Sequence, residues 1–214
     1  MSSADRQGKG LDYLEVKGGK DALLVGLHGR GSSPEGFASV AELISPDFTY
    51  IFPRAPFRFL NGYEWYHFDD RQEEGIMRSM ELLGRFFSEI KEKYQAGKGK
   101  IILFGFSQGA VMAFHYGLQH PRIFSGLIGM SGYLYRPERL SRLISKEAEG
   151  MPVLIIHGSR DEVITDEFMT GREIETYLRG FRIGAEFLEF DMGHEVTMES
   201  LDAARNWIEA RIKK

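Results

Sequence analysis

The sequence predicts an α/β fold with a mostly parallel central sheet of about seven strands and helices on both faces. Short apolar runs recur along the chain and alternate with longer stretches in which apolar residues repeat at helical spacing. When strands and helices alternate in this way, successive strands pair in parallel and the helices cover both faces of the sheet. Glycine-containing turns follow several of the apolar runs, as expected where strands end at one edge of such a sheet.

The expected strands differ in how far they are buried. Residues 11–17 alternate apolar and polar side chains, as an edge strand does, whereas residues 22–27 are almost continuously apolar, as in a strand that is covered on both faces. Similar runs predict five further strands, at residues 48–52, 100–104, 126–130, 152–156 and 185–190. Helical spacing predicts helices at residues 34–44, 71–94, 108–119, 137–146, 166–178 and 196–212.

Length and composition favour one globular domain. The chain has 214 residues, of which 43% are hydrophobic and 27% are charged, so it can bury a single large core. Residues 1–10 are rich in serine, glycine and charge, and we expect them to be disordered, with the domain spanning residues 11–214. Only a short segment separates the expected strand at 126–130 from Pro152, which leaves no room for a large cap domain.

Charge and cysteine content exclude several classes of partner and chemistry. The net charge of −4 and the scattered lysines and arginines provide no basic face, so nucleic acid is not an expected partner. The absence of cysteine excludes disulfides, thiolate metal ligands and a cysteine nucleophile. No apolar stretch approaches a membrane span, and the polar N-terminus lacks a signal-peptide core, so we expect a cytoplasmic protein. A homodimer is compatible with the sequence.

Ser107 is the candidate nucleophile. It is the centre of Gly105-Phe106-Ser107-Gln108-Gly109, directly after one expected strand and directly before one expected helix. In a nucleophile elbow the serine lies on a sharp strand-to-helix turn, and glycines flank it because a Cβ there would collide with neighbouring backbone. In a chain with 25 glycines the pentapeptide also arises by chance. The assignment therefore depends on its partners.

Those partners follow later strands in the expected sheet. A serine hydroxyl needs a neutral imidazole as its base, and the imidazole needs a carboxylate that fixes its tautomer and stabilises its cation. Asp161 follows the strand at 152–156, and His194 follows the strand at 185–190. Because carboxyl ends of parallel strands share one edge, these groups are expected to converge on Ser107. The order serine, acid, histidine is that of the α/β-hydrolases.

Four segments together resemble the α/β-hydrolase superfamily: LHGRGSS, GFSQGA, HGSRDEV and GHEV. Within it, the chain is most similar to the compact carboxylesterase, acyl-protein thioesterase and lysophospholipase group, and the likeness covers nearly everything after residue 20. The resemblance implies that Ser107 is the nucleophile, His194 the base and Asp161 the orienting acid, with the amides of Arg30 and Gln108 as the oxyanion hole. Two positions depart from the group, which often has an apolar residue at 30 and a second glycine at 110.

Several other residues compete for these roles. Asp191 is the main rival to Asp161, while Asp166 fits better as the start of the next helix. His157 and His28 also follow strands, and we interpret both as residues that brace their loops. Ser131 lacks the preceding glycine of an elbow. His28, Asp161 and His157 could converge as metal ligands, but no spacing typical of a metal site supports this interpretation, and we predict no metal and no cofactor.

The densest aromatic stretch, residues 57–68, follows the strand at 48–52. As a loop at a strand end it would form an apolar wall for an acyl or aryl group, and we predict Trp65, with Leu60 and Tyr63, as substrate-binding residues. These features predict a serine carboxylesterase for small-molecule esters with small to medium acyl or aryl groups. A thioesterase or lysophospholipase with the same triad is the alternative. A non-catalytic ligand-binding protein on this fold fits less well because all three triad members are present.

Overall fold

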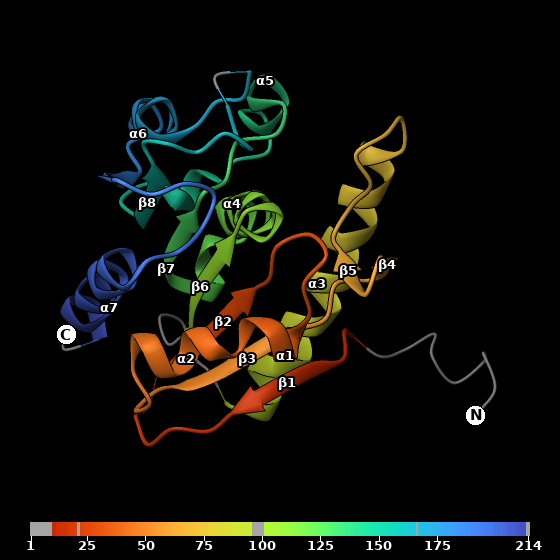
Figure 1. The fold of residues 1–214 in the computed structure, drawn as a ribbon, viewed down its shortest axis with the longest axis vertical. Helices are drawn as coiled ribbons and strands as arrows, with labels where there is room; N and C mark the ends of the chain where they lie inside the picture. Colours follow the sequence, from red (N-terminus) through yellow and green to blue (C-terminus); the bar gives the residue numbers. More distant parts are fainter. Residues whose placement is uncertain (1–9, 21, 96–100, 166, 213–214) are drawn as a thin grey trace.

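A seven-stranded sheet forms the centre of the molecule (Figure 1). The computed structural model describes residues 10–20, 22–95, 101–165 and 167–212. Along the sheet the strands follow the order β1-β3-β2-β6-β7-β8-β9, and only β1 is antiparallel to its neighbour. Their bounds are β1 Tyr13–Val16, β2 Leu23–Leu27, β3 Thr49–Pro53, β6 Ile101–Phe106, β7 Phe124–Met130, β8 Pro152–Gly158 and β9 Gly184–Phe190. The expected fold class and the seven expected strands are confirmed.

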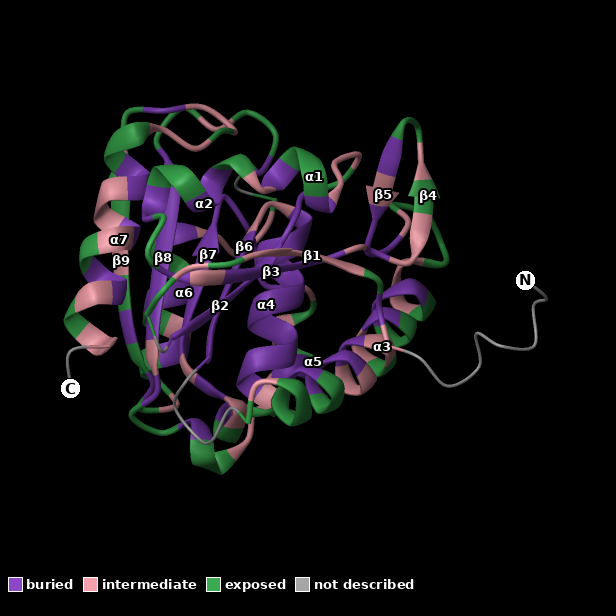
Figure 2. Cartoon of the chain, turned by 90° about the horizontal axis from the view of Figure 1, so that it is seen from below, coloured by how far each residue is buried: buried purple, intermediate pink, exposed green. Residues whose placement is uncertain are grey.

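Two apolar cores lie on opposite faces of this sheet. Alternate side chains of a strand enter opposite cores: Leu23 and Val25 of β2 belong to one, and Leu24 belongs to the other. The first core packs under α3 (Gln72–Lys93), α4 (Gln108–Gln119) and α6 (Gly171–Arg179). The second packs under α1 (Pro34–Phe37), α2 (Ser39–Ile44) and α7 (Met198–Ile212). Figure 2 shows that the inner strands of the sheet and most of α4 are buried, whereas the edge strand β1 is only half-buried.

Three helices are shorter than the sequence pattern predicts. The helix expected at 34–44 is divided into α1 and α2, which meet at Ala38. The helix expected at 137–146 ends early as α5 (Pro137–Leu140): Leu140 is fully buried, whereas Leu143 is exposed and Ile144 is only partly buried against the core. α6 begins at Gly171, whose φ of +43° is incompatible with a helix that continues through it. Asp166, the expected helix start, lies outside the described residues.

A β-hairpin replaces part of the expected aromatic loop. Its strands are β4 (Phe57–Phe59) and β5 (Gly62–Glu64), and they pair with each other rather than with the central sheet. In Figure 2 the hairpin projects beside the sheet on the side of α1 and α3. The segment between β7 and β8 holds only α5 and the short 3₁₀ helix Lys146–Ala148. Of residues 1–10, which we expect to be disordered, residues 1–9 lie outside the described ranges, and the Gly10 amide donates to Glu89 Oε1 at 2.6 Å.

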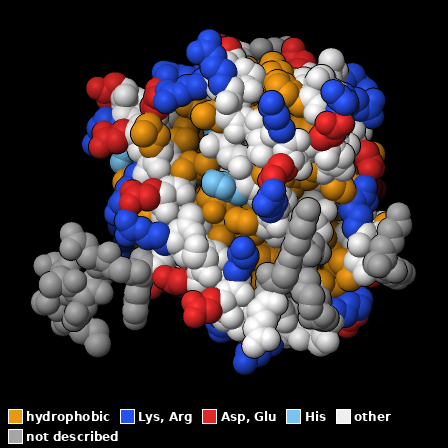
Figure 3. Space-filling view, turned by 180° about the vertical axis from the view of Figure 1, so that it is seen from behind, with side chains coloured by type: hydrophobic (Ala, Val, Ile, Leu, Met, Phe, Trp, Pro, Cys, Tyr) orange, Lys and Arg blue, Asp and Glu red, His pale blue; other side chains and the backbone are white. Residues whose placement is uncertain are grey.

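The surface shows no separation of charge on the face opposite to that of Figure 1. Side chains of both signs are interspersed there (Figure 3), and the exclusion of nucleic acid stays a prediction. Among the helices of the described residues, none is both long and apolar enough to cross a bilayer.

Two buried histidines are expected to make stability fall in mild acid. His28 and His115 are 0% and 6% exposed, and burial lowers the pKa of each from 6.5 to about 4. Between these pH values the unfolded chain binds protons that the native protein does not, so the free energy of unfolding falls as pH decreases and levels off below about pH 4. The free energy of unfolding measured with urea is expected to decrease by roughly 2 kcal/mol per histidine between about pH 7 and about pH 5. His115→Gln is expected to reduce this loss by about one histidine's share, and an unchanged pH dependence would contradict the assignment.

Candidate active site

Ser107 lies on a strained turn between β6 and α4. Its φ of 54° and ψ of −120° fall outside the regions that residues with a side chain normally adopt. The turn is fixed in place because the Ser107 amide donates to the Met130 carbonyl at 2.9 Å. A Cβ on Gly109 would lie 2.0 Å from the Leu27 carbonyl oxygen, so only glycine allows α4 to start this close to β2. The strand-turn-helix geometry is that of a nucleophile elbow.

His194 and Asp161 complete a continuous hydrogen-bonded chain with Ser107. The Ser107 hydroxyl lies 2.8 Å from His194 Nε2, and His194 Nδ1 lies 2.8 Å from Asp161 Oδ2. The other Asp161 oxygen accepts the amides of Val163 and Ile164, each at 2.9 Å. Burial opposes ionisation of Asp161, but these amides and His194 outweigh it and lower its pKa. The carboxylate is therefore ionised at neutral pH and can accept from Nδ1 of His194.

Asp191, the alternative candidate for the acid, does not pair with His194. The Asp191 side chain is 84% exposed, and its Oδ1 pairs with Arg160 Nε at 2.6 Å rather than with His194. It is therefore a surface carboxylate in this structure.

The other candidates of the sequence analysis lie beside the Ser107–His194–Asp161 chain without belonging to it. His157 Nε2 is 3.5 Å from Asp161 Oδ2, and burial lowers the pKa of this histidine, which keeps it neutral. The Ser131 hydroxyl is buried and has no partner among the described residues. His28 braces its loop as expected, because it donates from Nδ1 to the Gly29 carbonyl and accepts the Ala55 amide at Nε2. Within the described ranges, no group of three or more histidines and carboxylates is placed to hold a metal ion.

The amides of Arg30 and Gln108 are available for an oxyanion. Gln108 is the first residue of α4, where backbone amides have no partner within the helix and the helix dipole favours negative charge. Neither amide donates to a backbone carbonyl in the part of the chain that the structure describes. These properties agree with the predicted oxyanion hole, which stays a prediction.

The aromatic stretch is arranged differently from the expected substrate wall. Trp65 is 0% exposed, so it cannot contact a ligand here, and its indole Nε1 donates to the His28 carbonyl at 2.9 Å. Leu60 is 83% exposed at the tip of the hairpin, and Tyr63 is half-buried, with the guanidinium groups of Arg54 and Arg58 5.1 and 4.6 Å from its ring centroid. The prediction for Trp65 is corrected: it supports the loop behind the site, because its polar group reaches a buried carbonyl.

Arg30, Phe59 and Phe68 form a cluster that the sequence pattern does not reveal. The Arg30 guanidinium lies over the Phe59 ring at 3.8 Å from its centroid and 5.1 Å from that of Phe68. Phe59 and Phe68 lie 29 and 38 positions further along the chain. The departure of Arg30 from the usual apolar residue gives a hint in the sequence, but not the identity of its partners.

Comparisons with known proteins show which families this chain is similar to. "Putative hydrolase MhqD" of Bacillus subtilis is 28% identical over 94% of this chain and 100% of its own length. "Acyl-protein thioesterase 1" of Schizosaccharomyces pombe is 30% identical over 67% of this chain and 70% of its own length. The crystal structure of esterase PE8 superimposes with a TM-score of 0.81 at 28% identity, covering 94% of this chain and 98% of that one.

The sequence profile of the phospholipase/carboxylesterase family matches residues 14–212. The resemblance found in the four sequence segments is thereby confirmed, and so is the prediction of a hydrolase that acts on carboxylic ester bonds. The chain belongs to the phospholipase/carboxylesterase family.

Proposed function

We propose that the protein is a serine carboxylesterase that hydrolyses small to medium acyl or aryl esters through an acyl-enzyme on Ser107. The observation that carries this proposal is the unbroken chain from the Ser107 hydroxyl through His194 to Asp161, with 2.8 Å at each link. The amino terminus of α4 directly after the serine supports the same chemistry, since it favours the negative charge that develops on an attacked carbonyl.

Each residue then has a defined part in two acyl-transfer steps. His194 Nε2 takes the Ser107 proton while the hydroxyl oxygen attacks the ester carbonyl, and the oxyanion lies between the amides of Arg30 and Gln108. When the C–O bond breaks, the imidazolium gives this proton to the departing alcohol. Water repeats the sequence on the acyl-enzyme, releases the carboxylic acid and restores the serine. Asp161 stabilises the imidazolium in both steps, and no cofactor takes part.

A thioesterase is the second candidate. The Schizosaccharomyces pombe relative carries the name acyl-protein thioesterase, and a thioester passes through the same oxyanion with a thiolate as leaving group. A lysophospholipase would also use this triad. The acyl-transfer machinery is common to all these candidates. They differ only in the leaving group and in the surface that receives it.

A matched substrate panel tests the proposal. Acetyl, butyryl, octanoyl and palmitoyl groups are presented to the wild type as p-nitrophenyl esters and as thioesters of one small thiol. We expect turnover of the esters, with kcat/KM highest for the short and medium acyl groups. A preference for palmitoyl thioester over every ester would favour the thioesterase, and no turnover of any member would favour a non-catalytic protein.

A further inference from the structure

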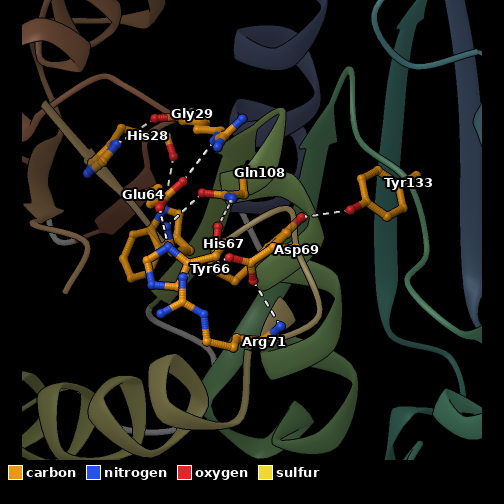
Figure 4. A network of polar contacts seen from close by, with 11 residues as sticks. His28, Gly29, Glu64, Tyr66, His67, Asp69, Arg71, Gln108 and Tyr133 are labelled. Carbon is orange, nitrogen blue, oxygen red and sulfur yellow. Dashed lines mark hydrogen bonds and ion pairs between the residues drawn. The ribbon is translucent and has the colours of Figure 1, made fainter. Parts of the chain in front are cut away.

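Glu64 is a buried carboxylate that none of the steps above uses. It is the last residue of β5, and its side chain is 2% exposed. One carboxylate oxygen accepts Arg30 Nε at 2.7 Å, and the other accepts His67 Nδ1 at 2.5 Å (Figure 4). Burying a carboxylate costs free energy unless hydrogen-bond partners replace the lost water. Arg30 and His67 therefore make the burial of Glu64 possible.

Several contacts join the loop that carries the Arg30 amide to the hairpin that carries Glu64. Besides the ion pair, two backbone hydrogen bonds of 2.8 Å join that loop to the hairpin, from the Gly31 amide to the Tyr63 carbonyl and from the Tyr63 amide to the Ser32 carbonyl. A Cβ on Gly62 would lie 2.2 Å from the Gly31 carbonyl oxygen, which shows how closely the two backbones approach. The Arg30 side chain is thus directed to the hairpin, where Phe59 covers it.

Gln108 holds the adjacent residues of the same segment. Its side-chain oxygen accepts the Trp65 amide at 2.6 Å, and its nitrogen donates to the Tyr66 carbonyl at 2.6 Å. Both ends of the side-chain amide are therefore used, and its orientation is determined. Trp65 in turn donates from Nε1 to the carbonyl of His28, two residues before Arg30. The two residues with free amides at the site thus both attach their side chains to residues 64–66.

We propose that Glu64 is a positioning residue for the oxyanion hole, which acts by fixing the Arg30 loop against residues 64–66. This inference rests on the proposed function. An oxyanion donor is effective only when it lies within hydrogen-bond distance of the oxygen as charge develops, so a small displacement of the Arg30 amide weakens transition-state binding more than substrate binding. Glu64 and Arg30 stand 34 positions apart in the sequence, and their contact gives the unusual arginine a role away from the substrate.

Glu64→Gln tests the proposal, with Glu74→Gln as the matched control, since Glu74 is exposed on α3. We expect Glu64→Gln to lower kcat roughly 10- to 100-fold and to weaken a trifluoromethyl ketone, whose adduct mimics the oxyanion, by a similar factor. KM for the ester is expected to change less than about threefold. Glu74→Gln is expected to match the wild type. A lowered melting temperature would identify a loss of activity that comes from unfolding of the variant.

Arg30→Lys keeps the backbone amide and the charge but lacks the Nε group that Glu64 binds, so it provides a second route if Glu64→Gln folds poorly. We expect a similar loss of kcat. The kcat of the double variant is expected to be no lower than that of the less active single variant, because both substitutions break the same Arg30–Glu64 contact. A folded single variant with wild-type kcat, or a loss confined to KM with unchanged ketone affinity, would overturn the inference. If the wild type hydrolyses no ester, the proposed function fails instead.

Discussion

Ser107→Ala is expected to lower kcat for ester hydrolysis by roughly 10⁵-fold or more, because the nucleophile that forms the acyl-enzyme is lost. Alanine retains the backbone turn and leaves the amides of Arg30 and Gln108 in place, so substrate binding should persist. Initial rates on p-nitrophenyl butyrate, with enzyme at high concentration for the variant, measure the loss.

Ser159→Ala provides the matched control for this change. Ser159 also follows a strand, β8, but it is exposed and is not part of the hydrogen-bonded chain of Ser107, His194 and Asp161. We expect it to keep full activity. Should Ser107→Ala hydrolyse the ester within about tenfold of the wild-type rate, the serine could not be the nucleophile.

Asp161→Asn is expected to lower kcat by roughly 10⁴-fold while the protein stays folded. The asparagine oxygen can still accept the amides of Val163 and Ile164, which preserves the loop. Its NH₂ group, however, faces His194 Nδ1 and favours the tautomer in which Nε2 carries the hydrogen. His194 can then no longer accept the Ser107 proton, and its cation loses the carboxylate that stabilises it.

Asp191→Asn measures the alternative acid under the same conditions. Because the Asp191 side chain is 84% exposed and pairs with Arg160, we expect its removal to change kcat less than about twofold. A large loss in Asp191→Asn together with a small loss in Asp161→Asn would reverse the assignment of the acid.

The centre of the sheet could be predicted from sequence because its inner strands are covered on both faces and therefore appear as apolar runs. β2 and β6 are entirely or almost entirely buried, and both stood out as such runs. The residues of the predicted triad follow β6, β8 and β9, so the topology that brings strand ends to one edge also brings Ser107, Asp161 and His194 together.

The hairpin and its contacts could not be predicted in the same way. β4 and β5 have three residues each, too few to establish an alternating pattern. The burial of Trp65 depends on the side chain of Gln108, 43 positions away, and on the carbonyl of His28. Such pairings are set by tertiary structure, so an aromatic residue at a strand end gives the same sequence signal whether it lines a cleft or supports a loop. α5 is shorter than expected for a related reason, since periodicity does not reveal that Leu143 remains exposed.

Labelling with a fluorophosphonate tests the central claim most directly, since this reagent reacts with a serine that an adjacent histidine activates. The account predicts one adduct per chain, located on Ser107 by peptide mass spectrometry. Labelling should be lost in Ser107→Ala and retained in Ser159→Ala. An adduct on another residue, or ester hydrolysis by the wild type that continues unlabelled and uninhibited, would contradict it.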